Sequence, residues 1–120
     1  MQKYGISDAS YQPPANDTER QKKRRELFEK HGQYNSSSEF WKQVAATNYL
    51  NDLKGAIQIH HAVDDNVVNV GYSRDLMKLL DNTSIPHELS EYDSGGHNIS
   101  GGSFNAAMAR TVEFYKKYLK

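Results

Sequence analysis

Two polar segments in the C-terminal half of the chain contain the residue types that could carry out catalysis. The first, His60–Val67, reads HHAVDDNV, and the second, Tyr92–Asn98, reads YDSGGHN. A carboxylate that hydrogen-bonds to a histidine fixes the tautomer of the imidazole and stabilises its protonated form. The two segments could therefore supply the acid and the base of a nucleophile–base–acid triad.

Short apolar segments next to these loops predict two strands that end where the polar residues begin. The first strand is expected at Ala56–His60, with Ile57 and Ile59 on one face. Pro86 leads into a second strand at His87–Tyr92. Both polar segments would then follow the carboxyl end of a strand.

One helix between the strands and one after them complete a βαβα unit. The first is predicted from about Val70 to Asn82, and the second carries apolar residues at the spacing of one buried face. These residues are Phe104, Ala107, Met108, Thr111, Val112, Tyr115, Tyr118 and Leu119. Strands joined in this way are parallel, and catalytic groups gather beyond the carboxyl ends of parallel strands. Because neighbouring strands are about 4.8 Å apart, an aspartate on one loop could accept a hydrogen bond from a histidine on the other.

The same segments also allow simpler interpretations of single residues. His60 and His61 are adjacent in a strand, so their side chains point to opposite faces and are not expected to share a metal. Asp65 is interpreted as a turn-forming residue. Asp64 could be an ordinary capping residue and His97 an ordinary loop histidine.

A polar N-terminal segment precedes this unit. It is predicted to contain one helix that begins at Asp17 or Thr18 and ends before Gly32. The basic run Lys22–Arg25 lies near three acidic residues, so it is interpreted as a solvated helix face. We therefore divide the chain into an insertion-like or lid-like segment, residues 1–38, and a βαβα part, residues 39–120.

The composition of the 120-residue chain excludes several classes of protein. Fifteen basic and fifteen acidic residues give a net charge of zero, which argues against binding to nucleic acid or a membrane through bulk charge. The absence of cysteine excludes a thiolate metal site, and no metal or cofactor is predicted. No stretch approaches the roughly 18 apolar residues of a membrane span, and Met1–Gly5 contains no apolar signal-peptide core. The compartment is not fixed, although the cytoplasm is favoured.

The two polar segments resemble the C-terminal end of α/β-hydrolases, and within them the prolyl-oligopeptidase-like serine hydrolases. In that family the seventh strand ends in His-Gly-Thr-Ala-Asp-Asp-x-Val, and a Gly-rich Tyr-x-x-x-x-His pattern follows the eighth strand. The resemblance places Asp64 on the triad acid and His97 on the base, and it extends over Glu39–Leu119. It therefore favours a catalytic role for both residues, and Asp64 and His97 are expected within hydrogen-bonding reach of each other or one side-chain rotation from it. His61 stands where the family usually has Gly, and its bulk is expected to alter the turn before Asp64 or to crowd the base.

The resemblance also implies a serine nucleophile in a Gly-x-Ser-x-Gly turn, and this chain lacks that motif. Gly71–Asp75 supplies only its first half, and Ser100 has no preceding strand. Because the family order is Ser, Asp, His, the nucleophile and the oxyanion donors are expected upstream of residue 1. The resemblance therefore implies the C-terminal part of a hydrolase that acts on peptides or small esters.

The chain alone is expected to hydrolyse no ester or peptide above background, because it has a base and an acid without a nucleophile. An assay with an activated ester checks this expectation. Turnover that is abolished by His97→Ala and by a serine-directed phosphonate would contradict it.

A second interpretation is a non-catalytic remnant of the same α/β fold that acts as an oligomerisation or interaction module. In either case the expected fold is the last two parallel strands of an α/β-hydrolase with flanking helices, preceded by a helical insertion. Two strands cannot bury the apolar faces of these helices, and the first strand keeps an unpaired edge. The chain is therefore expected to self-associate, most simply as a two-fold dimer, unless the first 55 residues fold over this edge.

Overall fold

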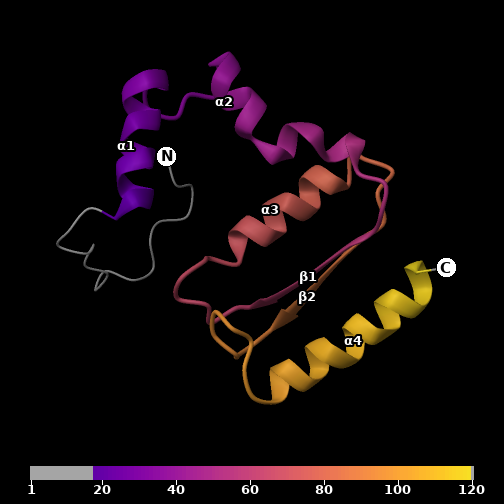
Figure 1. Ribbon diagram of the computed structural model, residues 1–120. Coiled ribbons are helices and arrows are strands. Elements are labelled where there is room, and N and C mark those ends of the chain that lie inside the picture. Colours follow the sequence, from indigo (N-terminus) through magenta and orange to yellow (C-terminus); the bar gives the residue numbers. More distant parts are fainter. Residues whose placement is uncertain (1–17, 120) are drawn as a thin grey trace.

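The computed structural model describes residues 18–119, in which two parallel strands lie between helices (Figure 1). Strand β1 (Ile57–Ala62) pairs with strand β2 (His87–Tyr92) in a two-stranded parallel sheet. This pairing confirms the predicted parallel βαβα order, and β2 has the predicted bounds. The loop predicted within residues 1–17 lies outside the described residues.

Strand β1 extends further at its C-terminal end than the predicted Ala56–His60. Ala62 lies opposite Tyr92 in the register of the sheet. The N–H of Val63 still donates to the carbonyl of Tyr92, with N and O 2.7 Å apart. The polar loop after β1 therefore begins at Val63, directly beside the end of β2.

Two helices cover opposite faces of the sheet (Figure 1). Helix α3 (Gly71–Leu80) connects the strands, and helix α4 (Gly102–Tyr118) follows β2. His60 hydrogen-bonds to Thr111 of α4, whereas the adjacent His61 hydrogen-bonds to Ser73 of α3. The alternation of side chains along β1 thus assigns one histidine to each face of the sheet. The best buried apolar side chains of the βαβα unit include Ala62, Val70, Leu80, Ile85 and Tyr92.

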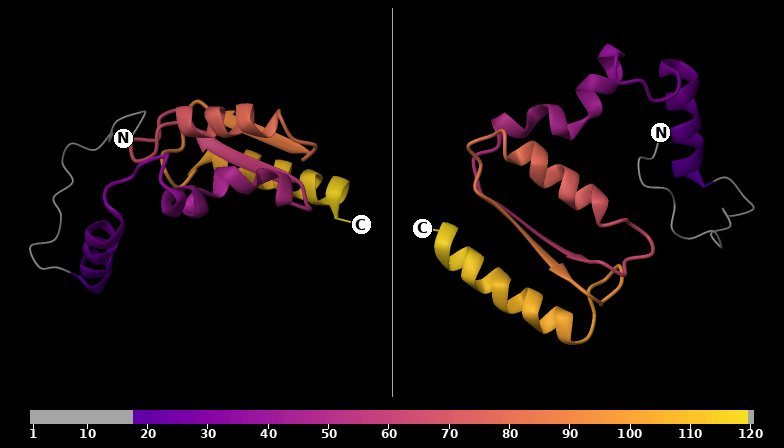
Figure 2. Two further views of the ribbon diagram at one scale, coloured as in Figure 1. Left: turned by 90° about the horizontal axis from the view of Figure 1, so that it is seen from above. Right: turned by 180° about the vertical axis from the view of Figure 1, so that it is seen from behind.

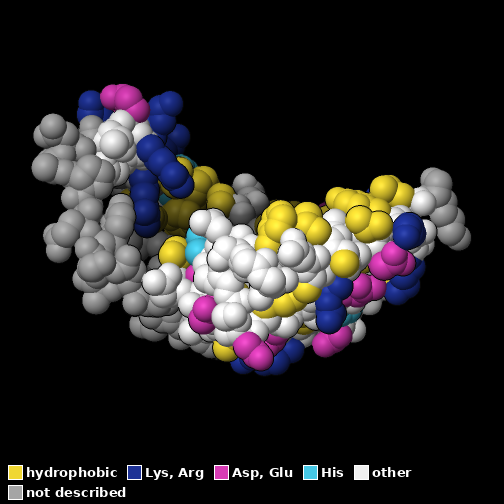
Figure 3. Space-filling view, turned by 90° about the horizontal axis from the view of Figure 1, so that it is seen from below, with side chains coloured by type: hydrophobic (Ala, Val, Ile, Leu, Met, Phe, Trp, Pro, Cys, Tyr) yellow, Lys and Arg dark blue, Asp and Glu magenta, His cyan; other side chains and the backbone are white. Residues whose placement is uncertain are grey.

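Only part of the apolar face predicted for α4 is buried. Ala107 and Phe114 are 3% and 8% exposed. Five other large apolar residues of this face are between 44% and 69% exposed, and we call them the α4 stripe: Phe104, Met108, Val112, Tyr115 and Leu119. Hydrophobic side chains gather along this side of the molecule in Figure 3. This partial burial is what was expected of a sheet of two strands, which is too narrow to cover the whole apolar face of α4.

The described part of the N-terminal segment is helical. Helix α1 (Glu19–His31) begins after Thr18, whose hydroxyl accepts from the N–H of Gln21 at 3.2 Å while the Gln21 side chain accepts from the N–H of Thr18 at 2.7 Å. This reciprocal capping box satisfies two of the exposed N–H groups of the first turn. The helix ends at Gly32, which has a positive φ of 73°. Both predicted ends of this helix are confirmed.

Helix α1 contacts the rest of the chain through aromatic rings, and it stands away from the sheet in all views (Figures 1 and 2). Helix α2 (Glu39–Val44) and a 3₁₀ helix, η1 (Ala46–Asp52), connect α1 to β1. Trp41 of α2 is 7% exposed, and its ring lies 5.7 Å from that of Phe28 in α1. His31 of α1 also stacks on Phe40 of α2 at a centroid distance of 3.6 Å.

We expect Phe28→Ala to detach α1 from α2. Helix α1 has no fully buried residue, and a 13-residue helix without tertiary packing is marginal in water. Since Trp41 is the only tryptophan of the chain, its fluorescence should shift to longer wavelength while far-UV ellipticity decreases. Leu27→Ala, which removes a more exposed neighbour in the same helix, should change both signals much less. An unchanged tryptophan spectrum in Phe28→Ala would contradict this prediction.

Candidate active site

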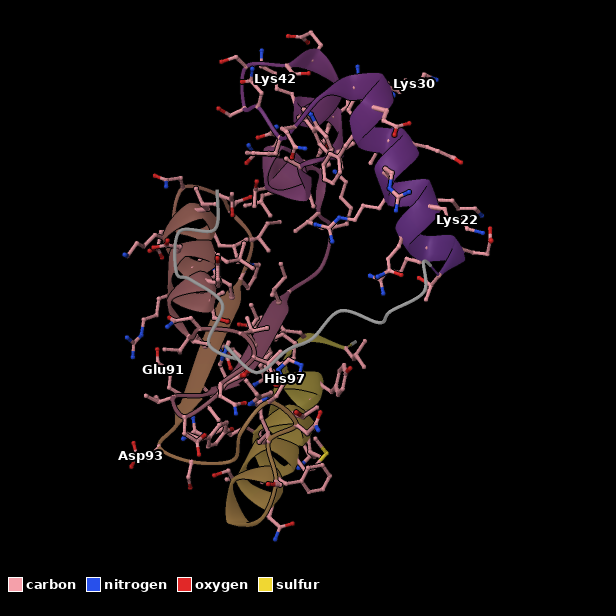
Figure 4. The ribbon with its side chains drawn as sticks, turned by 90° about the vertical axis from the view of Figure 1, so that its left-hand side faces the viewer. Lys22, Lys30, Lys42, Glu91, Asp93 and His97 are labelled. Carbon is pink, nitrogen blue, oxygen red and sulfur yellow. The ribbon has the colours of Figure 1, made fainter. Side chains whose placement is uncertain are left out.

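The two polar loops leave the same edge of the sheet, since β1 and β2 are parallel and their last residues pair with each other. Residues 63–70 follow β1 and residues 93–101 follow β2. Figure 4 shows His97 toward the middle of the molecule at this edge, whereas Glu91 and Asp93 point outward. The predicted convergence of the two loops at the carboxyl ends of the strands is thus present in the structure.

His97 is oriented by Asp65. Its Nδ1 lies 3.0 Å from Oδ2 of Asp65. Because an ionised carboxylate has no proton to donate, Nδ1 must carry the hydrogen of this bond. In the neutral ring Nε2 then keeps its lone pair, and no described residue hydrogen-bonds to it. The side chain of His97 is 47% exposed, whereas that of Asp65 is 5% exposed, so the carboxylate is sheltered and the imidazole is about half exposed.

Asp65 is itself held by the turn that follows it. Its Oδ1 accepts from the N–H groups of Val67 and Val68, at 2.8 and 2.9 Å. Burial alone would raise the pKa of Asp65, but the hydrogen bonds from Val68, His97 and Val67 outweigh burial and lower that pKa below its ordinary value. The carboxylate therefore stays ionised and fixed in orientation, as a group that orients an imidazole requires.

Asp64 binds the loop that carries His97 rather than His97 itself. Its carboxylate accepts from the N–H of Gly96 at 2.8 Å and from the N–H of Gly95 at 3.3 Å. No hydrogen bond joins Asp64 to His97 in the described residues, so the pairing differs from the one predicted between these two side chains. The physical reason is that the two successive glycine amides donate to the Asp64 carboxylate, which leaves the carboxylate of Asp65 as the acceptor for His97.

The backbone at Gly95 and Gly96 explains why these amides point toward Asp64. Both residues have positive φ, 144° and 62°, a region that other residues rarely occupy. A Cβ at Gly95 would also lie 3.3 Å from the Cα of Ile99 and 3.4 Å from the nitrogen of Ser100. The loop can therefore fold tightly before His97 only with glycine at position 95.

His61 lies beneath the turn instead of crowding the base. Its side chain is 9% exposed and faces α3, and its Nε2 lies 2.8 Å from the carbonyl of Val68 and 3.3 Å from Oδ2 of Asp65. Its Nδ1 lies 2.7 Å from the hydroxyl of Ser73. A hollow of about 260 Å³ opens over these groups, lined by His60, His61, Ala62, Asp65, Val68, Ser73, His97 and Ile99.

Sequence reasoning missed the contacts of Asp65 and Ser73. Asp65 stands two and three residues before the amides of Val67 and Val68, which bind its carboxylate. This spacing indicates a turn, but it does not indicate that the second carboxylate oxygen binds His97. Ser73 lies twelve residues after His61, on the helix that packs over it. Among the described residues, no serine hydroxyl hydrogen-bonds to His97, and no group of three or more acidic or histidine side chains is arranged to hold a metal.

We expect Asp65→Asn to lower the stability of the chain at neutral pH by about 1–3 kcal/mol, because the hydrogen bonds to a charged acceptor are weakened. Since the folded-state pKa of Asp65 is lowered, this stabilisation is complete above the ordinary aspartate pKa of about 3.9 and is lost as the pH falls through the folded value. The gap between wild type and Asp65→Asn should therefore close in acid.

Urea unfolding at neutral pH and at several acidic values measures this gap. Asp93→Asn, at an exposed position after the same sheet edge, is the control and should change stability little at any pH. A gap that stays constant down to strong acid would contradict the ionised state of Asp65.

Within residues 18–119, no helix is both long and apolar enough to cross a membrane.

Comparison with known proteins leaves the chain without an established family. No family model, no curated protein and no solved structure matches this chain.

Proposed function

We propose that this chain is the C-terminal part of the catalytic domain of a serine hydrolase and supplies the base and the acid of its triad. The observation that carries this proposal is the Asp65–His97 pair, in which Nδ1 is 3.0 Å from the carboxylate and no described residue hydrogen-bonds to Nε2. Its place beyond the carboxyl ends of two parallel strands and the resemblance of both loop motifs to prolyl-oligopeptidase-like hydrolases support the same proposal.

The proposed chemistry is acyl transfer to water. His97 Nε2 takes the proton of a serine hydroxyl while the serine oxygen attacks the acyl carbon, and then gives this proton to the leaving group. Asp65 keeps the proton on Nδ1 and stabilises the imidazolium that forms. The serine and the oxyanion donors would come from residues upstream of this chain, and the substrates would be peptides or small esters.

The hydrogen bond to His97 and the family resemblance support two neighbouring aspartates as the proposed acid. The resemblance places it on Asp64, whereas the hydrogen bond to His97 comes from Asp65. We assign the orienting role to Asp65 and assign Asp64 the task of holding the glycine amides of the loop. The carboxylate of Asp64 would thus fix the position of His97 through the backbone.

The test uses the protein encoded by the whole reading frame in which this chain lies. We expect a Gly-x-Ser-x-Gly sequence upstream, labelling of its serine by a fluorophosphonate, and hydrolysis of an activated ester that His97→Ala abolishes. His87→Ala, at the opposite end of β2, should retain activity. A reading frame without an upstream serine motif, or activity that survives His97→Ala, would overturn the proposal.

A second candidate function is a non-catalytic interaction module. The exposure of the α4 stripe and the two-stranded sheet favour it, because both leave surface that another chain could cover. Absence of the upstream serine motif together with a stable dimer would select this function over the hydrolase.

A further inference from the structure

A continuous series of polar side chains runs from α3, along the face of the sheet that α3 covers, to His97. The hydroxyl of Ser73 lies 2.7 Å from Nδ1 of His61, and Nε2 of His61 lies 3.3 Å from the Asp65 oxygen that His97 also contacts. Ser73, His61 and the side chain of Asp65 are all at most 9% exposed. Ser73, His61 and Asp65 are thus shielded from solvent, whereas the imidazole of His97 is about half exposed.

The surroundings of His61 define where its proton lies. Nε2 faces two oxygens, the carbonyl of Val68 and the carboxylate of Asp65, and neither can donate a hydrogen bond. Nε2 must therefore carry the hydrogen. In the neutral ring Nδ1 is then the acceptor, and the hydroxyl of Ser73 donates to it.

His61 holds the turn that presents the Asp65 carboxylate. The carbonyl of Val68 accepts from His61, while the N–H of the same residue donates to Oδ1 of Asp65 at 2.9 Å. His61 also lies against Oδ2, the oxygen that accepts from His97. Because Nε2 of His61 contacts both ends of the Asp65–Val68 turn, the carboxylate has little freedom to rotate away from His97.

We propose that His61 is a positioning residue that clamps the Asp65–Val68 turn and so keeps the proton of His97 on Nδ1. The catalytic meaning of this role rests on the proposed function, in which Nε2 of His97 is the base that takes the proton of the serine hydroxyl. His61 itself touches neither substrate nor nucleophile. The hydroxyl of Ser73 donates to Nδ1 of His61, which fixes the imidazole of His61 in the required tautomer.

Nitrogen-15 NMR of the imidazole rings tests this inference on the 120-residue chain, without substrate. The measured quantity is the ratio of the Nδ1–H to the Nε2–H tautomer of neutral His97. His61→Leu removes the donor to the turn and should lower this ratio about tenfold, the effect of losing one hydrogen bond to a charged group. His61→Gln places an amide N–H near the former Nε2–H and should retain most of the ratio.

His60→Leu is the matched control, since it removes a half-buried histidine of the same strand from the opposite face. A ratio that is unchanged in His61→Leu, or that falls equally in His60→Leu, overturns the proposal. Should His61→Leu fail to fold, the wild-type spectrum decides, because a proton on Nδ1 of His61 would contradict the clamp. Failure of the proposed function would appear separately: the whole-frame protein would show no turnover, while His61→Leu would still lower the tautomer ratio of His97.

Discussion

Replacing Asp65 by Asn should lower kcat of the proposed complete hydrolase by about 10⁴-fold, the magnitude seen when a triad carboxylate is made neutral. An Asn at this position can accept the amide hydrogen bonds of Val67 and Val68, but it no longer fixes the tautomer of His97 or stabilises its charged form. The contact between Asp65 and His97 at 3.0 Å is what makes this effect large.

Asp64→Asn is the decisive comparison. Asp64 accepts only from the amides of Gly95 and Gly96 among the described residues, and an Asn side chain retains an acceptor for one of them. We expect a loss of about tenfold in kcat, equivalent to roughly one displaced hydrogen bond. Steady-state kinetics with an activated ester measure both variants. A larger loss in Asp64→Asn than in Asp65→Asn would show that the acid lies at Asp64, as the family resemblance implies.

The second large effect is expected in assembly, where the isolated chain should sediment as a dimer at micromolar concentration. In the described residues the α4 stripe is exposed, and no third strand pairs with either edge of the sheet. At about 25 cal/mol per Å², covering a few hundred Å² of apolar surface is worth several kcal/mol. We propose a second copy of the chain as the occupant, because the net charge of zero imposes no repulsion between copies.

Val112→Lys should weaken this dimer at least about tenfold, because it replaces buried apolar surface with a charge. Leu79→Lys is the matched control, since Leu79 is 45% exposed on α3 while Val112 is 52% exposed on α4. Sedimentation velocity over a range of concentrations measures both dissociation constants. A cooperatively melting wild-type monomer at micromolar concentration would contradict self-association.

The order and type of the elements could be predicted because each has a local cause. Apolar alternation before His60 and after Pro86 indicated the strands, and the residues at Thr18 and Gly32 indicated the ends of α1. These signals depend on a few neighbouring residues. They are therefore readable without knowledge of the tertiary structure.

Which residues of α4 are buried, and which residue partners His97, could not be predicted in the same way. The two predicted strands indicated that part of the apolar face of α4 stays exposed, but the spacing of Met108 and Val112 does not indicate that they belong to the exposed part. Two adjacent aspartates satisfy one motif equally well, and the choice between them depends on the turn amides and the glycine φ angles. Both outcomes depend on contacts between segments far apart in the sequence.

The constant separation of paired residues in the sheet has a consequence for synthesis on the ribosome. Ile57 pairs with His87 and Ala62 with Tyr92, so β1 leaves the ribosomal exit tunnel well before its partner does. At a synthesis rate of about 5–20 residues per second, the nascent β1 stays without a partner for roughly 1.5–6 seconds. During this interval α3 can form from local contacts, but the backbone of Ile57–Ala62 is open on both edges. Chaperone capture of the nascent chain would therefore be most useful before β2 emerges.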